Sequence, residues 1–246
     1  MAVNFKNYHD KVGKDAVDIY LHGEIIDDSN KFFMKMFDIN EGFVLPCDIR
    51  EQLQKFKGKP LNVYINSPGG EVASGLAIAN MLARHDAPVT AYIDGVAASM
   101  ASCIFLSCPK RVMPSNALLM IHRPICTLTG NVDELLSAAT VLETVGRGML
   151  TSYIAAAKKG VAKSQIEADM KAETWYTAED AAKLFDIEII NQKKDMQMAA
   201  CAAFNGIYQH IPEALKAVQP AQTAANAVTN KQKAYIKTVL SATKWR

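Results

Sequence analysis

The stretch PVTAYIDGVAASMASCIFLSC, residues 88–108, decides how the chain is expected to fold. Its first six residues form an apolar run rich in β-favouring types, which predicts a buried strand, and Ser99 to Cys108 predict a buried helix. Ser99 therefore lies where a strand turns into a helix. The first turn of a helix offers N–H groups without partners, which favours a developing oxyanion, so Ser99 is a candidate nucleophile. Taken alone, the same pattern is more typical of tight helix packing.

The preceding stretch has the same organisation. Leu61 to Asn66 predicts a strand, Ser67-Pro-Gly-Gly70 a turn, and Glu71 to Arg84 a helix. Two consecutive strand–helix units predict parallel strands joined by right-handed crossovers, and the fold class is therefore α/β. The carboxyl ends of both strands then lie at one edge of the sheet, which brings the Gly-rich turn close to Ser99.

Further elements are expected on both sides of this unit. Asp48 and Glu51 form a capping-box pattern at the start of one helix. The predicted strands cover residues 16–21, 112–114 and 117–121, and the predicted helices cover residues 47–56 and 131–159, with two short ones after Ser164 and Thr177. The apolar face of the long helix is wide enough for a subunit interface as well as a core.

Composition narrows the class of protein. The 246 residues are 50% hydrophobic and 21% charged, which suits either one large globular domain or one domain with an appendage. A formal net charge of +2 gives no indication of nucleic acid or an anionic membrane as partner. No apolar run reaches the ~18 residues that a membrane span needs, and the N-terminus has no apolar signal core, so we expect a soluble, cytoplasmic protein.

Three parts of the chain are expected: a polar N-terminal segment over residues 1–14, a folded domain over residues 15–195, and a basic extension over residues 196–246. The extension has one acidic residue, Glu213, against six Lys or Arg, and we predict helices in it over residues 212–218 and 230–245.

The five cysteines include no Cys-x-x-Cys pair, which favours reduced packing residues over a disulfide framework or a zinc site. They are Cys47, Cys103, Cys108, Cys126 and Cys201. Cys103 follows Ser99 by one helical turn, where it could face the same site, but packing is the favoured role.

His122 is the candidate base. It ends the apolar run of residues 117–121, and imidazole is the side chain with a pKa near neutrality that a serine nucleophile needs. A lone histidine at a strand end is more often structural. The presence of a candidate serine nucleophile is what favours a catalytic role for His122. The other four histidines lie in polar or terminal contexts that suggest no such role.

The remaining groups of such a site are an acid and two N–H donors. Glu173 is the leading candidate for the acid that orients the imidazole, and Asp169 is the second. The backbone N–H groups of Gly70 and Met100 are the candidate oxyanion donors. The plainer interpretation of Glu173 is a solvated acid on a loop. The plainer interpretation of Gly69-Gly70 is a simple strand-to-helix turn.

Three stretches together resemble the signatures of the Clp-type serine peptidases, in the order and at the spacing of that family: Asn66-Ser-Pro-Gly-Gly70, Gly95-Val-Ala-Ala-Ser-Met100 and Met120-Ile-His-Arg-Pro124. The resemblance runs from about residue 61 to 180, and more loosely from 15 to 60. It implies the αβ spiral that these peptidases share with crotonases, with Ser99 as nucleophile, His122 as base, and an oxyanion hole from Gly70 and Met100. It also implies a homo-oligomer of stacked rings, with the strand and helix of residues 125–159 as the handle between rings.

Departures from the family pattern bear on function. Glu173 stands where the family usually has its catalytic aspartate, and Phe185 where a glycine usually closes the last helix. We find no counterpart of the N-terminal stretch that forms axial loops in housekeeping members, which disfavours an ATP-driven unfoldase as partner. With its Glu-Thr-Trp-Tyr-Thr acid loop and extended C-terminus, the chain most resembles phage and prophage members associated with head maturation.

We therefore expect a serine endopeptidase that cuts scaffold or capsid-precursor polypeptides and needs no metal or cofactor. Three alternatives stay open: a housekeeping proteolytic subunit that works with an ATPase, an acyl-CoA hydratase or isomerase of the same fold, and a non-catalytic ring or scaffold-binding protein that acts through its basic tail.

Overall fold

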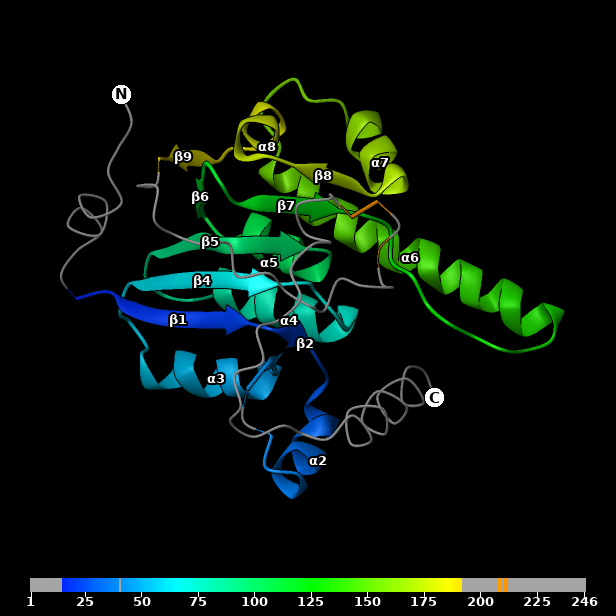
Figure 1. The fold of residues 1–246 in the computed structure, drawn as a ribbon, viewed down its shortest axis with the longest axis horizontal. Coiled ribbons are helices and arrows are strands. Elements are labelled where there is room, and N and C mark those ends of the chain that lie inside the picture. Colours follow the sequence, from blue (N-terminus) through cyan, green and yellow to red (C-terminus); the bar gives the residue numbers. More distant parts are fainter. Residues whose placement is uncertain (1–14, 40, 192–207, 209, 212–246) are drawn as a thin grey trace.

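A computed structural model describes residues 15–39, 41–191, 208, 210 and 211 (Figure 1). The strands are β1 (Val17–His22), β2 (Glu24–Ile25), β3 (Phe43–Val44), β4 (Leu61–Ser67), β5 (Val89–Ala98), β6 (Lys110–Pro114), β7 (Leu118–Ile121), β8 (Thr174–Tyr176) and β9 (Glu188–Ile190). The helices are a 3-10 turn, η1 (Asp28–Asn30), and α2 (Lys31–Met36), α3 (Pro46–Lys55), α4 (Val72–Ala83), α5 (Met100–Ser107), α6 (Val132–Ala156), α7 (Lys163–Ala172) and α8 (Ala178–Leu184).

The main sheet has seven strands and is almost entirely parallel. Its order is β1-β4-β5-β6-β9; β7 pairs in parallel with β5, and β8 pairs antiparallel with β7. A separate parallel pair, β2 and β3, lies beyond the end of β1. The predicted α/β class and the predicted parallel strands are confirmed.

Strand β5 is longer than predicted and serves two neighbours on one side. Its first half, Thr90 to Tyr92, pairs with β6, and its second half, Val96 to Ala98, pairs with β7. Between the halves the register to β4 jumps from Ile65–Ile93 to Ser67–Ala97, so β5 carries two extra residues there. Such a bulge bends a strand and re-aims its end. The bend carries the chain from the main sheet to the position of Ser99.

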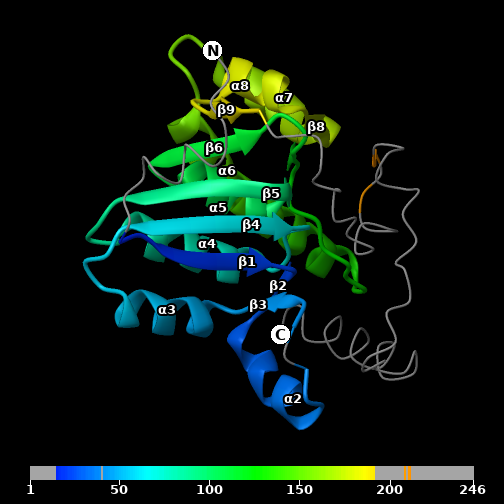
Figure 2. The same ribbon diagram turned by 60° about the vertical axis from the view of Figure 1, so that its left-hand side comes forward.

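Helices α4, α5 and α6 lie together on one face of the sheet, as Figure 2 shows from the side. Every residue of α5 except its last is buried. A helix that is apolar all round is expected at the centre of a core. Helix α5 therefore begins directly after Ser99 and is held on all sides, which fixes the direction of its first turn.

Helix α6 is partly inside the domain and partly outside it. Its 25 residues span about 37 Å at 1.5 Å per residue, and its N-terminal half projects away from the sheet (Figure 1). Its buried residues, from Met149 to Ala156, all lie in the last turns. Asn131 caps the helix through a complete capping box with Glu134, as the sequence indicated.

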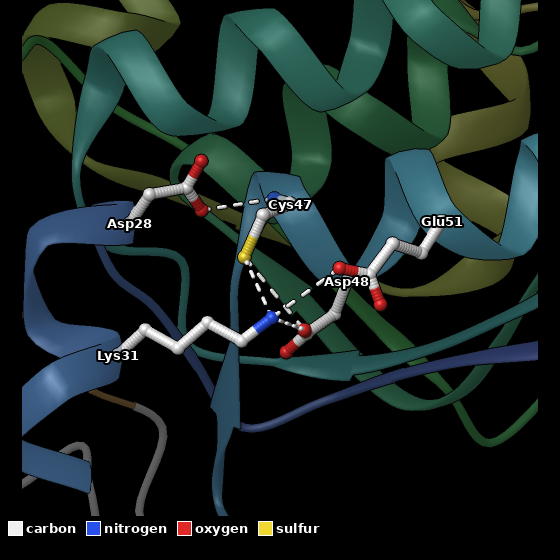
Figure 3. Close-up of polar contacts among 5 residues, drawn as sticks. All are labelled: Asp28, Lys31, Cys47, Asp48 and Glu51. Atoms are coloured by element: carbon white, nitrogen blue, oxygen red, sulfur yellow. Dashed lines mark hydrogen bonds and ion pairs between the residues drawn. The ribbon is translucent and has the colours of Figure 1, made fainter. Parts of the chain in front are cut away.

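One predicted cap is wrong. Helix α3 has Leu45 at its N-cap with no side-chain bond, and it begins with Pro46, whose fixed φ suits that position. Asp48 instead accepts a hydrogen bond of 2.7 Å from Lys31 Nζ, and Glu51 lies 3.6 Å from the same nitrogen (Figure 3). The ammonium group of α2 is a stronger partner for these carboxylates than a backbone N–H, so the pair links two helices instead of capping one.

The strand expected in the handle is also not formed, since residues 122–131 adopt no regular structure. A strand needs a neighbour to accept and supply its hydrogen bonds, and in the described part of the chain no segment pairs with this one. The predicted helices of the extension and its Cys201 lie outside the described residues, as does the N-terminal segment 1–14. Cys47, Cys103 and Cys108 are buried free thiols, and Cys126 is a partly exposed one.

Phe185 closes α8 without a left-handed residue. Its φ of −112° and ψ of 153° are extended, so the glycine that the family uses has no conformational role here. The ring is fully buried and lies edge-on to Tyr176, at 6.3 Å between centroids. None of the helices in the described ranges is long and apolar enough to cross a membrane.

We expect Phe185→Ala to lower the free energy of unfolding by about 3–5 kcal/mol, because it leaves a cavity where a whole ring was buried. Urea denaturation followed by circular dichroism measures this. Phe32, whose side chain is 65% exposed, is the matched control, and Phe32→Ala should change stability by about 0.5 kcal/mol at most. Equal effects of the two substitutions would show that Phe185 does not close the core.

Candidate active site

Ser99 occupies a strained turn between β5 and α5. Its φ of 54° and ψ of −124° are rare for a residue with a side chain, and such a conformation costs roughly 1–3 kcal/mol. Two interactions hold it: its N–H donates to the carbonyl of Met120 on β7 at 3.1 Å, and α5 is locked in the core. The turn leaves the hydroxyl pointing out of the core at the carboxyl edge of the sheet, where His122 lies.

His122 follows directly after β7, the neighbour of β5, and its Nε2 lies 2.7 Å from Ser99 Oγ. Both residues are buried, with 5% and 8% of their surface exposed. Burial lowers the pKa of His122 below its ordinary value, and the negative charge of Glu173 opposes that shift. The imidazole is therefore neutral near pH 7 and can accept the Ser99 proton at Nε2.

Of the two candidate acids, Glu173 is the one whose charge acts on His122. It ends α7 in a left-handed conformation, with φ of 52°, and its side chain is 14% exposed. Among the described residues no hydrogen bond joins its carboxylate to the imidazole; Glu173 Oε1 instead accepts the backbone N–H of His210 at 2.7 Å. The orienting role of Glu173 stays a prediction.

Asp169 is engaged elsewhere. Its Oδ2 accepts the hydroxyl of Tyr176 at 2.8 Å, and its Oδ1 accepts the amide of Gln165 at 2.9 Å. These bonds fix the end of α7 against β8. Asp169 thus has a structural position one turn before Glu173, and it does not contribute to the pKa shift of His122.

The Gly-rich turn lies against Ser99, as its place at the sheet edge predicted. A Cβ atom on Gly69 would come within 2.7 Å of Ser99 Cβ and 2.9 Å of Met100 N, and Gly69 has a φ of +92°. Gly70 pairs with Ile25 in a β-bridge, and a Cβ on Gly70 would lie 2.0 Å from the Ile25 carbonyl oxygen. Both positions therefore require glycine.

The two candidate oxyanion donors are Gly70 and Met100. In the Ile25 bridge the N–H groups of Ile25 and Glu71 make the bonds, so the N–H of Gly70 faces the opposite edge. Met100 is the first residue of α5, where helix N–H groups lack intrahelical acceptors. Within the described part of the chain, neither N–H has an acceptor. Their role as an oxyanion hole stays a prediction that this arrangement supports.

Three neighbours of Ser99 were not identified from the sequence. Gly69 contacts Ser99 more closely than Gly70 does. Tyr153 of α6 is fully buried, and its hydroxyl bonds Ser102 Oγ at 2.9 Å and the Ser99 carbonyl at 3.4 Å. Tyr208 lies edge-on to the His122 ring. Gly69 belongs to the quoted Ser-Pro-Gly-Gly motif, whereas no pattern in the sequence distinguishes the two tyrosines.

Cys103 packs in the core. It is fully buried, and burial raises the pKa of its thiol to about 12, so it is not a reactive thiolate. Among the described residues no group of three His, Cys, Asp or Glu side chains is arranged to hold a metal ion.

A family model described as Clp protease matches residues 51–193, more than half of the chain. The chain belongs to the Clp protease family. That membership favours a serine peptidase over an acyl-CoA hydratase or isomerase, and the match covers the strained serine, the histidine and the acid loop alike.

Several relatives carry the name ATP-dependent Clp protease proteolytic subunit. Subunit 1 of Protochlamydia amoebophila is 34% identical over 146 residues, which are 57% of this chain and 69% of the relative. The subunit of Porphyromonas gingivalis is 31% identical over 138 residues, 55% of this chain and 61% of the relative. Subunit 1 of Chlamydia muridarum is 33% identical over 129 residues, 50% of this chain and 66% of the relative. The Clp-type match thus spans about two thirds of these relatives.

Replacing the charge of Glu173 should change the titration of His122. Glu173→Gln removes an interaction that stabilises the imidazolium, so the pKa of His122 falls further, while the amide oxygen can still accept the His210 N–H. The rate at which a fluorophosphonate labels Ser99 depends on neutral His122, so its inflection with pH should move to lower pH.

Asp169→Asn is the matched control, because it removes a charge from the same helix. We expect it to leave the inflection unchanged. If the inflection shifted in Asp169→Asn and not in Glu173→Gln, then Asp169 would be the acid whose charge acts on His122.

Proposed function

We propose that the protein is a serine endopeptidase in which Ser99 is the nucleophile and His122 the base. The observation that carries this proposal is the 2.7 Å contact between Ser99 Oγ and His122 Nε2, in a chain of the Clp protease family. The serine is held in a strained turn at a helix N-terminus, where a nucleophile is exposed to substrate and an oxyanion is stabilised.

The chemistry follows from these positions. Ser99 Oγ attacks the carbonyl carbon of a peptide bond while its proton passes to His122 Nε2, and the negative charge of Glu173 stabilises the imidazolium. The oxyanion of the tetrahedral intermediate accepts the N–H groups of Met100 and Gly70. His122 then donates its proton to the leaving amine. Water, deprotonated by His122, hydrolyses the remaining acyl-enzyme and regenerates Ser99.

The proposed working form is a homo-oligomer of stacked rings. Support comes from the projecting half of α6, which has four apolar side chains that are 43–71% exposed: Val132, Leu135, Leu136 and Val141. Apolar surface of this extent on a projecting helix is typical of a subunit interface. The same contacts would give residues 123–131 the neighbour that a strand requires.

Within this activity we propose head maturation as the biological role, with scaffold or capsid-precursor polypeptides as substrates. Support comes from the resemblance of the Glu173 acid loop and of the extension over residues 196–246 to phage and prophage members. A second candidate, a proteolytic subunit that works with an ATPase, is favoured by the names of the relatives.

Ser99→Ala should abolish covalent labelling by a fluorophosphonate and reduce cleavage of an unfolded protein on the order of 10⁴-fold or more, because the nucleophile is lost. Ser107→Ala is the matched control, since Ser107 lies at the other end of α5 and bonds only within that helix. Labelling that survives Ser99→Ala would refute the assignment. A chain that binds capsid precursors without cutting them, unaffected by Ser99→Ala, would be a scaffold-binding protein.

The two roles differ in their need for ATP. A head maturation peptidase should cleave a purified scaffold or capsid precursor without an ATPase, and gel electrophoresis of the mixture measures this. Casein, a loosely folded protein, is the control for general peptidase activity. Cleavage of a folded substrate only when a Clp-type ATPase and ATP are added would select the second candidate.

A further inference from the structure

Part of the chain's own C-terminal extension lies on the candidate active site. Tyr208, His210 and Ile211 are the fragment coloured orange in Figure 1, and they contact residues that are far away in the sequence. The ring of Tyr208 lies edge-on to the His122 imidazole, with 5.4 Å between centroids and an angle of 86°. Its hydroxyl donates a hydrogen bond to the carbonyl of Pro68, in the Gly-rich turn.

Tyr208 is also in contact with the nucleophile. Burial raises the pKa of Tyr208, and a hydrogen bond with Ser99 opposes that shift. The phenol therefore sits between the Gly-rich turn on one side and the Ser99–His122 pair on the other. A peptide bond under attack by Ser99 would have to enter the same space.

An apolar subsite receives the rest of this fragment. Tyr208 and Ile211 are 9% and 8% exposed and pack in one cluster with Val96, Ala98 and Met120. Trp175 of β8 borders the cluster, edge-on to Tyr208 at 6.0 Å. These residues come from the ends of β5, β7 and β8, which all converge on Ser99. The surface is thus continuous with the candidate catalytic pair.

A third anchor engages the acid. The backbone N–H of His210 donates to Glu173 Oε1 at 2.7 Å, and the His210 ring lies 4.0 Å from the same oxygen. Backbone hydrogen bonding combined with side chains in a pocket is how an extended peptide is recognised. The anchors therefore have the chemistry of a bound polypeptide, with an aromatic residue at the catalytic pair and a branched aliphatic residue three positions later.

We propose that the segment with Tyr208, His210 and Ile211 is a tethered occupant of the polypeptide-binding site, which keeps other polypeptides from Ser99 until it leaves. The subsite accordingly prefers substrates with an aromatic side chain next to the catalytic pair. This inference rests on the proposed function. A segment of the same chain competes intramolecularly, at an effective concentration that can exceed the concentration of a free substrate.

The test compares the rates at which a fluorophosphonate labels Ser99 in full-length chains. Tyr208→Ala removes the ring and should raise the labelling rate about tenfold or more, as expected when an intramolecular occupant is released. His210→Pro removes the N–H that Glu173 accepts and should also raise it. Tyr235→Ala is the matched control, a tyrosine of the same extension, and should leave the rate unchanged.

A peptide of residues 205–213, added to the Tyr208→Ala chain, should slow labelling again, whereas the same peptide with alanine in place of tyrosine should not. Equal labelling of the wild type and Tyr208→Ala, with Ser99 modified in both, would overturn the inference and leave the proposed function standing. No labelling in any chain would overturn both. Thermal melts show whether each variant folds. If Tyr208→Ala does not fold, the labelling rate of His210→Pro decides the question.

Discussion

The structure depends on how one strand, β5, is shared. Its first half pairs with β6 and its second half pairs with β7, so the strand must bend between Ile93 and Val96. Gly95 permits the bend, because a Cβ there would lie 3.0 Å from the Asn66 side-chain oxygen, which also accepts the Val96 N–H. The pairing with β7 then places Ser99 and His122 on adjacent strand ends. The distance between Ser99 and His122 is therefore set by backbone pairing.

The same arrangement explains how the strain at Ser99 is maintained. A conformation that costs roughly 1–3 kcal/mol persists only when the surrounding packing determines it. Here Met120 accepts the Ser99 N–H, the buried helix α5 fixes the next residues, and the hydroxyls of Ser102 and Tyr153 bond the Ser99 carbonyl. Since each backbone polar group of Ser99 has a buried partner, relaxing the turn would leave those partners unsatisfied. The strained conformation of Ser99 is thus maintained by hydrogen bonds and packing that are present without a substrate.

Much of this could be predicted from the sequence, because local patterns specify local structure. Two strand–helix repeats gave the parallel sheet, and Asn131 and Thr177 marked the starts of α6 and α8. The predictions were wrong where contacts with residues distant in the sequence decide the local structure. Asp94-Gly95 has the composition of a turn, yet neighbouring strands keep it within β5, and Lys31 draws Asp48 away from a cap. Residue types were enough to select Ser99 and His122, whereas Tyr208 has no pattern and joins the site only through folding.

The contacts of Tyr208 and His210 act on two parts of the catalytic group at once. Tyr208 lies edge-on to the His122 imidazole. Burial of His122 is the main cause of its lowered pKa. His210 donates its backbone N–H to Glu173 Oε1, so one oxygen of this acid is already hydrogen-bonded. If the segment leaves as proposed, water can reach the pair, and the loss of burial would raise the pKa of His122 toward its ordinary value. Under the proposal, release of the segment would uncover Ser99 and make His122 a stronger base in one step, so occupancy of this site would affect the chemistry as well as the access.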